Sequence, residues 1–459
     1  MIVLKIFVVL FLLISLYFTV KLDFIQVRYF KEGCKKLLED KQSSNGISPF
    51  AASALAVGGR IGAGNIVGVA FAIYFCGYGV IFWMWIANLL AMATSFVEAT
   101  LSQVYKTYDA SDQYISGPMV YIKRGLPSKY NFLAIVYGII LIATIGLIFI
   151  RLYTSIITES ILAFTGVTDD LRLELIVVFI VGLVSSYIIL GGTKKMAKTL
   201  AYIVPVIVLT YIILIIMIAL QNLQAIPFFF TTIFTSAFSV NSIAEGGVLL
   251  MVFFATYLSV ISSEAGFGTS TIASGMATTT HPATMGLVNM ITVFIDNLVF
   301  TLTGFVFMLA LEEGIVFTNF SSTSEIIMHY SGTYYYGGAV LLLAIIFVFS
   351  LGSIITSATY GLQVIKYLIA KHRVKLVSRI YYGTIILIIL LTPFGYVDDR
   401  IVRFIFAASG LILFSINIIA VILLRDVAFK TFKHYKRTSK VFKPDELKIK
   451  YQDENNIWK

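Results

Sequence analysis

The chain is poor in charge, cysteine and histidine, and each shortage excludes a class of protein. Charged residues make up 13% of its 459 residues, about half the share of a typical soluble domain. Its two cysteines, Cys34 and Cys76, lie far apart without a CxxC pattern, so they predict neither a disulfide framework nor a metal site. Its four histidines are scattered, and the sequence contains no HExxH, GxSxG or phosphate-loop motif. These shortages argue against an enzyme.

Apolar residues dominate instead, at 59% of the sequence, and they gather in long runs. A helix needs about 20 mostly apolar residues to cross a membrane, and on this measure we expect about eleven spans. The first run lacks a small-residue cleavage site, so it predicts a spanning helix rather than a signal peptide. The expected fold class is an all-α integral membrane protein. The expected spans are residues 2–20, 47–76, 78–104, 132–163, 172–191, 199–220, 244–275, 284–311, 333–369, 376–392 and 401–424.

Basic and acidic loops alternate between these spans, and the alternation predicts the orientation. Lysine and arginine gather at 21–41, 106–129, 194–198 and 371–379, whereas acidic residues gather in the loops between them. Basic loops stay in the cytoplasm. We therefore expect a multi-pass protein of the cell membrane (plasma or inner), with its N-terminus outside and its C-terminus cytoplasmic. The same loops account for the net charge of +10, so we predict contact with lipid and no nucleic-acid or protein partner.

The predicted organisation has five parts. An extra N-terminal transmembrane helix (1–21) and a cytoplasmic amphipathic segment (22–46) precede two five-helix repeats (47–220 and 221–424), and a basic cytoplasmic tail (425–459) follows. We expect the amphipathic segment at the membrane interface and the tail near anionic lipid. Because each repeat holds an odd number of spans, the two repeats are expected to have opposite orientations, as in an inverted-topology repeat.

Two glycine-rich polar stretches interrupt the predicted spans about two hundred residues apart. The first is GGRIGAGN at 58–65, and the second is SSEAGFGT at 262–269. Inside a membrane, unwound backbone is tolerated only where it is buried in protein or lines a cavity. Broken helices at matching places in two halves of a chain indicate the binding site of a secondary transporter. We therefore predict a carrier for a small solute.

The first break offers backbone N–H groups to an anion. Gly62, Gly64 and Asn65 let the chain leave the helix, and the following half-helix presents its positive end, which suits a substrate carboxylate. The alternative is that the glycines serve close helix packing.

The second break supplies further candidate substrate-binding residues, among them an acid inside the membrane. Such acids face a cavity or a partner, and Glu264 is expected to take a proton, hold a cation or cap the half-helix. The candidates are Ser262, Ser263, Glu264 and Gly266.

Sodium-binding candidates come from the first break and the ninth predicted span. A hard cation prefers oxygen ligands, which backbone carbonyls at Gly59 and Gly62 and the hydroxyls of Ser353, Thr356 and Ser357 offer. Serines and threonines on spanning helices also bond back to their own backbone, which is the alternative.

Arg151 and Asp296 are candidates for coupling or gating, because both are expected inside spans. A charge there needs a counter-charge. We expect Arg151 to face Asp296, Glu264 or the substrate itself.

These residues lie in motifs that resemble the bacterial and archaeal sodium:alanine (alanine or glycine:cation) symporter family. The resemblance covers about residues 20–425. The matching motifs, in order, are GGRIGAGNIVGVAFAI from 58, GYGVIFWMWIANLLAMATSFVEATLSQVYK from 77, SGPMVYI from 116, SSEAGFG from 262, HPATMGLV from 281, VFIDNLV from 293 and SIITSATYG from 353.

The resemblance implies a leucine-transporter-like five-plus-five inverted repeat with one extra N-terminal helix and two discontinuous helices. It implies sodium-coupled uptake of a small amino acid such as alanine or glycine by alternating access, with the sodium ion as coupling ion and no cofactor. By match, Gly62, Gly64 and Asn65 hold the substrate carboxylate and the Ser262–Gly266 turn faces it. Ser353 and Ser357 fall at pocket positions of the ninth span.

Departures from the family pattern leave alternatives open. A pocket tryptophan of the family is replaced by Ser357, and Arg151 lies near the family's amide-bearing stretch. A divergent member for a larger or anionic amino acid is one alternative, and a proton-coupled carrier that uses Glu264 or Asp296 is another. A channel is a third, but no pore-forming repeat is visible in the sequence.

Overall fold

The structure is a computed structural model that describes residues 2–39, 45–167, 170–239, 247–312, 337–395 and 399–438 and positions 442, 447, 457 and 458. In this part of the chain, eight helices are long and apolar enough to cross a membrane. The protein is therefore an all-α multi-pass membrane protein, as expected. The count of about eleven spans stays a prediction, because the broken spans form shorter helices here.

The first half of the chain alternates long helices with short connections. Its elements are α1 (Ile2–Lys21), α2 (Ile25–Arg28), α3 (Phe30–Leu37), α4 (Pro49–Arg60), α5 (Ala63–Cys76), α6 (Gly79–Tyr105), β1 (Thr107–Tyr108), β2 (Tyr114–Ile115), α7 (Pro118–Gly125), η1 (Ser128–Tyr130), α8 (Asn131–Ala143), η2 (Thr144–Ile148), α9 (Phe149–Thr165), α10 (Leu171–Ile189), α11 (Gly192–Gln221) and α12 (Ala225–Ala237).

The second half contains the longest helices. Its described elements are α13 (Gly247–Ser263), α14 (Ser270–Gly275), α15 (Pro282–Glu312), α17 (Gly338–Leu368), η4 (Lys371–Arg373), α18 (Val374–Leu391), η5 (Thr392–Phe394) and α19 (Asp399–Thr438).

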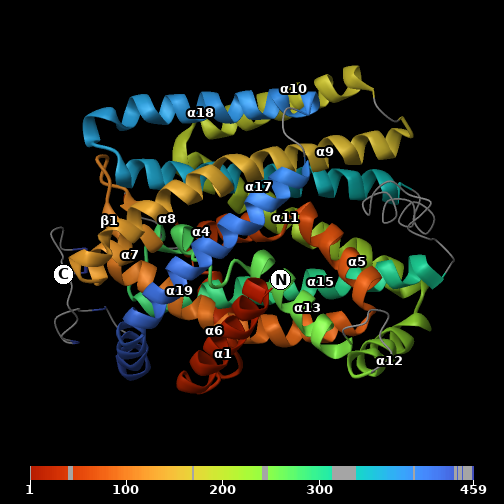
Figure 1. The fold of residues 1–459 in the computed structure, drawn as a ribbon, viewed down its shortest axis with the longest axis horizontal. Helices are drawn as coiled ribbons and strands as arrows, with labels where there is room; N and C mark the ends of the chain where they lie inside the picture. The colour runs from red at the N-terminus through yellow and green to blue at the C-terminus, as the bar shows by residue number, and fades with distance from the viewer. Residues whose placement is uncertain are drawn as a thin grey trace.

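The helices pack in layers around the two breaks (Figure 1). Helices α10 and α18 lie side by side along one long edge, with α9 and α17 next to them. Helices α1 and α12 lie toward the opposite edge, and α19 crosses the face nearest the viewer. The broken helices α4 and α5 contact α6, α11, α15 and α17, so the breaks lie inside the protein rather than against lipid.

Several elements were not predicted from the sequence. Helix α12 has 13 residues, which is shorter than the roughly 20 that a span requires. The β1–β2 hairpin and α7 lie in the predicted basic loop at 106–129. The predicted span at 132–163 is one continuous rod, in which a π-helical turn, η2, joins α8 to α9.

Helix α19 continues through the first part of the predicted basic tail, from residue 425 to Thr438. This extension packs on the protein rather than resting only near lipid. Tyr435 donates a hydrogen bond to Glu32 at 2.5 Å, Lys436 forms an ion pair with Asp23 at 2.9 Å, and His434 lies 3.1 Å from His281.

The amphipathic segment at 22–46 forms α2 and α3, and α3 packs against α15. Phe30 meets Phe294 edge-on with 4.8 Å between ring centroids. A Cβ atom at Gly33 would lie 2.8 Å from Ile291. The apolar face of this segment is therefore covered at least partly by protein.

An ion pair ties the β1–β2 hairpin to the end of α17. Lys366 donates to Asp109 at 2.8 Å, and Asp109 also accepts the backbone N–H groups of Ser111 and Gln113. Burial alone would raise the pKa of Asp109, but these bonds and the charge of Lys366 hold it below its ordinary value.

We expect Asp109→Asn to lower the free energy of unfolding by about 1–3 kcal/mol at pH 7, because Lys366 loses a mostly buried counter-charge. The carboxylate with a lowered pKa stabilises the fold above the ordinary aspartate pKa, and this contribution is lost as pH falls through its folded pKa. Thermal unfolding in detergent from pH 7 to pH 3 measures both effects. The variant should lose this part of the pH dependence.

Asp112→Asn is the matched control, since Asp112 is exposed on the same hairpin. Equal destabilisation by the two substitutions would contradict the role of the ion pair.

Candidate functional site

The first predicted break is present in the structure. Helix α4 ends at Arg60 and α5 begins at Ala63. Between them Ile61 and Gly62 have extended backbone, with φ −86° and −122°. A Cβ atom at Gly62 would lie 2.8 Å from a ring carbon of Tyr153, so α9 approaches the break too closely for a larger residue.

Hydroxyl groups of α17 meet the carbonyls of α4 just before this break. Ser353 Oγ donates to the carbonyl of Gly58 at 2.9 Å, and Thr356 Oγ1 donates to the carbonyl of Leu55 at 3.0 Å. A Cβ atom at Gly59 would lie 2.8 Å from Thr356. Oxygen atoms from two helices therefore converge here. The carbonyls that the hydroxyls contact are one turn earlier than the predicted carbonyls of Gly59 and Gly62.

The second predicted break is also present. Helix α13 ends at Ser263 and α14 begins at Ser270. Between them Glu264, Gly266 and Gly268 have φ values of +52°, +88° and +76°. This left-handed region favours glycine, and a non-glycine residue there costs roughly 1–3 kcal/mol. The chain keeps a strained glutamate at this point in spite of that cost.

Side chains from three other helices satisfy the peptide groups that the second break exposes. Glu98 of α6 is fully buried and accepts the backbone N–H of Gly266 at 3.0 Å. Asn417 of α19 donates to the carbonyl of Gly266 at 2.8 Å and to Glu98 at 2.5 Å. Tyr137 of α8 donates to the carbonyl of Phe267 at 2.7 Å. The expectation that Glu264 caps this break is not supported, because Glu98 accepts that N–H group instead.

Asp296 of α15 connects the two breaks. It accepts a hydrogen bond from Asn65, just after the first break, at 2.6 Å. It also accepts from Ser262, just before the second break, at 2.7 and 2.8 Å. All three side chains are more than nine-tenths buried. One carboxylate therefore holds both half-helices in register.

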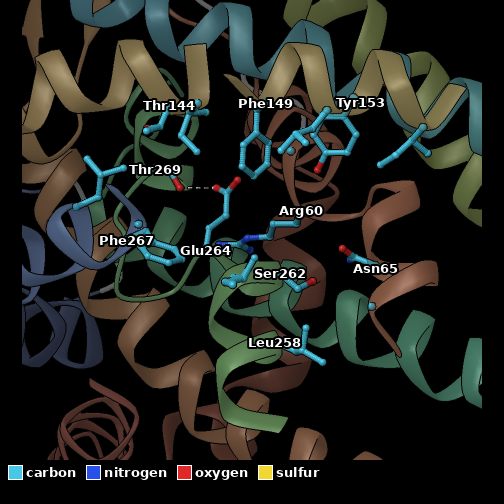
Figure 2. A pocket seen from close by; sticks show the side chains of 18 of the residues that line it. Arg60, Asn65, Thr144, Phe149, Tyr153, Leu258, Ser262, Glu264, Phe267 and Thr269 are labelled. Atoms are coloured by element: carbon cyan, nitrogen blue, oxygen red, sulfur yellow. Dashed lines mark hydrogen bonds between the residues drawn. The ribbon is translucent and has the colours of Figure 1, made fainter. Parts of the chain in front are cut away.

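Arg60 supplies the positive charge of the site. It is 1% exposed and donates to the hydroxyl of Ser270 at 2.7 Å and to Thr292. Its Nε–H has no hydrogen-bond partner in the described part of the chain. Glu264 lines the same cavity as Arg60 and accepts a hydrogen bond from Thr269 at 2.8 Å (Figure 2).

A cavity of about 190 Å³ lies between the two breaks (Figure 2). It exceeds the roughly 15 Å³ that one water needs, and it is smaller than the roughly 300–1,000 Å³ typical of drug-sized ligand sites. Its wall is mostly apolar. It is lined by Gly59, Arg60, Asn65, Gly68, Val69, Met84, Thr144, Ile145, Phe149, Leu152, Tyr153, Ile156, Leu258, Ile261, Ser262, Glu264, Phe267, Thr269, Phe300, Gly410 and Leu413.

The structure brings some of the predicted site residues together at this cavity. Asn65, Ser262 and Glu264 line it, and Gly59 of the predicted sodium set lines it too. The predicted residues outside its lining are Gly62, Ser263, Gly266, Ser353, Thr356, Ser357, Arg151 and Asp296, whereas the surroundings of Gly64 lie outside what the structure describes.

The residues outside the lining have different surroundings. Asp296 contacts two lining residues, as described above. Gly62 lies against Tyr153, and the carbonyl of Ser357 accepts a hydrogen bond from Tyr381 at 3.5 Å. Arg151 is buried on α9, yet the lining of the cavity includes its neighbour Leu152 and not Arg151 itself.

Sequence reasoning missed Arg60, Phe149, Tyr153, Phe267 and Thr269, which all line the cavity. Arg60 carried a signal, because an arginine inside an apolar run next to a break needs buried partners. The aromatic residues carried none, since phenylalanine and tyrosine occur throughout the apolar runs.

Comparison with known proteins identifies the family. The model of the sodium:alanine symporter family matches residues 1–449. The chain belongs to this family. Family membership together with this architecture makes the protein a secondary active transporter of amino acids rather than an enzyme.

Two relatives illustrate the similarity of this family member to characterised carriers. It is 30% identical over 437 residues to the amino-acid carrier protein AlsT of Bacillus subtilis, covering 93% of this chain and 88% of AlsT. It is 30% identical over 374 residues to the sodium/alanine symporter AgcS of Methanococcus maripaludis, covering 79% of this chain and 80% of AgcS.

The fold of this family member resembles that of a Na⁺-coupled sialic acid symporter solved in a substrate-bound outward-open state. The TM-score is 0.61 at 14% identity, over 92% of this chain and 86% of the other. The similarity confirms the leucine-transporter-like fold class. The pairing of helices into two inverted repeats stays a prediction.

We expect Asn417→Ala to lower the free energy of unfolding by about 2–4 kcal/mol. The substitution removes the buried hydrogen bonds that Asn417 makes with Glu98, with Tyr121 and with the carbonyl of Gly266. Thermal unfolding in detergent measures the effect. Ser415→Ala is the control, because Ser415 is exposed on the same helix and bonds only to its own backbone; a loss of similar size there would contradict the assignment.

Proposed function

We propose that this protein takes up a small neutral amino acid, such as alanine or glycine, together with sodium. The observation that carries the proposal is that Arg60 and Glu264, a buried cation and a buried anion, both line one small cavity. An amino acid carries one positive and one negative group on a single carbon atom. A buried cation next to a buried anion complements that pair of charges.

The two charged ends of the substrate have separate partners in this proposal. The carboxylate binds the guanidinium of Arg60, whose Nε–H has no other partner among the described residues, and the N–H groups at the start of α5, which Gly62, Gly64 and Asn65 open. The ammonium group binds Glu264 and the hydroxyl of Ser262. The apolar remainder of the wall suits a short uncharged side chain.

The coupling ion binds where α4 meets α17. The Ser353 hydroxyl lies 2.9 Å from the carbonyl of Gly58, and the Thr356 hydroxyl lies 3.0 Å from the carbonyl of Leu55. Oxygen atoms are the ligands that a hard cation takes. The predicted ligands Gly59, Gly62 and Ser357 lie within the same stretches of α4 and α17 or directly after them. Sodium bound there favours the state in which α4 and α17 are together.

Transport follows by alternating access. The cavity extends toward the start of α6, since Met84 lines it, whereas the hairpin and the Asp109–Lys366 pair lie at the other end of α6, about 33 Å along the helix. The substrate would cross the membrane if the protein opened at the hairpin end of α6 and closed at the end near Met84. Because Asp296 joins both breaks, the half-helices move as one unit.

A proton-coupled carrier is the second candidate. It is favoured by the two buried carboxylates of Glu264 and Asp296, either of which could carry a proton across the membrane. An anionic substrate held by Arg151 has less support, because Arg151 does not line the cavity.

Uptake of labelled amino acids into proteoliposomes tests the proposal. Alanine or glycine should accumulate under an inward sodium gradient and not under a potassium gradient. Accumulation that ignores sodium but collapses with the pH gradient would establish the proton-coupled carrier instead. Equilibration without accumulation would indicate a channel.

We expect Ser353→Ala and Thr356→Ala each to raise the sodium concentration for half-maximal uptake about tenfold or more. A hydrogen bond or ligand contact to a charged group contributes roughly 1.5–3 kcal/mol. The matched control is Ser350→Ala on the same helix, since the Ser350 hydroxyl is buried and has no partner in the described part of the chain. An equal shift in the control would refute the proposed ion site.

We expect Glu264→Gln to lower the rate of amino-acid uptake at low substrate concentration about 10- to 100-fold, because the substrate ammonium loses its counter-charge. Initial uptake rates against substrate concentration give this value. Arg151→Gln should keep the wild-type order of preference among neutral and acidic amino acids. A changed order in that variant would support the alternative with an anionic substrate.

A further inference from the structure

The wall of the cavity next to Phe267 is a single layer of side chains. Phe267, Ile261 and Gly410 line the cavity, and the same three residues also line a second void of about 10 Å³. Phe7 of α1 and Ala407 of α19 line the second void only. This volume does not exceed the roughly 10–15 Å³ that one water needs. Because Phe267 lines both spaces, its aromatic ring lies between the cavity and this small void.

Two further rings hold Phe267 in place. Phe414 of α19 meets Phe267 edge-on with 6.3 Å between centroids, and Phe7 meets Phe414 with 4.3 Å. A Cβ atom at Gly266 would lie 2.4 Å from the ring of Phe414. The backbone of the second break therefore approaches Phe414 directly. The N-terminal helix α1 thus supports the cavity wall through Phe414.

In the proposed binding mode, the side chain of a bound amino acid points toward Phe267. In Figure 2, Phe267 and Asn65 lie on opposite sides of Glu264. A substrate whose carboxylate lies near the start of α5, and whose ammonium group lies at Glu264, has its third substituent free for the apolar wall. Phe267 is only 8% exposed and is an aromatic part of that wall.

We propose that Phe267 limits the length of the substrate side chain, and that without its ring the space between α1, α13 and α19 becomes a side-chain subsite. The ligand class is amino acids with longer uncharged side chains, such as leucine. The inference rests on the proposed function, because it assumes an amino acid in the cavity. Phe7 and Phe414 are positioning residues, since they act through Phe267.

Removing the ring should join the two spaces without undoing the break. The bond that Tyr137 makes is to the backbone carbonyl of Phe267, so it survives replacement of the side chain. Each methylene that fits an apolar pocket changes discrimination by roughly 10- to 200-fold. The variant should therefore accept leucine much better relative to alanine.

The test is sodium-driven uptake of alanine and leucine by proteoliposomes that carry the full-length chain. We expect Phe267→Ala to raise the leucine-to-alanine uptake ratio about tenfold or more, and Phe267→Leu to raise it less. Phe429→Ala is the matched control, since Phe429 packs on Phe18 in the same α1–α19 interface and does not line either space. Its ratio should stay that of the wild type.

A second substitution tests whether the raised leucine-to-alanine uptake ratio comes from this space. In the double variant Phe267→Ala/Ala407→Leu, the leucine side chain refills the second void, and the uptake ratio should return toward the wild-type value. If the ratio stays high, the volume that accommodates leucine lies elsewhere, and the inference is overturned.

The outcomes separate the inference from the proposed function. If the wild type shows no sodium-dependent uptake of any amino acid, the proposed function fails. If the wild type transports alanine and the ratio is unchanged in Phe267→Ala, only the subsite is refuted. Should Phe267→Ala fail to fold, Phe267→Leu decides: a raised ratio supports the subsite, and an unchanged ratio refutes it.

Discussion

A peptide group that leaves a helix inside a membrane has no water to bind, and the structure depends on how this constraint is met. Each unpaired buried group would cost several kcal/mol. At the second break Glu98, Asn417 and Tyr137 bind the groups that Gly266 and Phe267 expose. These partners come from α6, α19 and α8. The open backbone at the binding site is therefore possible only because the surrounding helices supply side chains at fixed positions.

The first break meets the same constraint with fewer fixed partners. Ser353 and Thr356 bind carbonyls of α4, but a hydroxyl can also release its partner and turn toward a cation. This difference is the basis for placing the proposed sodium site beside the first break. The first break has oxygen atoms that a sodium ion can share. At the second break the protein already binds the polar groups, and Glu264, which has a positive φ and accepts a hydrogen bond from Thr269, also lines the cavity.

Local patterns predicted the breaks, and long-range contacts determined what surrounds them. The glycine-rich stretches were readable because Gly62 and Gly266 interrupt apolar runs. Glu98 and Gly266 are 168 positions apart, and Asn417 and Glu98 are 319 apart. The hydrophobic periodicity of a single span gives no information about contacts between residues so far apart. The helical nature of the segment after residue 425 was readable, however, since Phe429, Phe432 and Tyr435 recur at helical spacing among the basic residues.

Arg60 shows why one missed residue changes the interpretation of the site. The sequence placed two arginines in apolar runs, and mid-span position singled out Arg151. In the folded chain Arg60 lies at the break itself, anchored on Ser270 and Thr292 from the other half of the protein. With Arg151 outside the cavity lining, the positive charge that lines the cavity belongs to α4, the helix that also carries the Leu55 and Gly58 carbonyls of the proposed sodium site. A shift of α4 would therefore alter both sites together, and coupling between ion and substrate requires such a shared element.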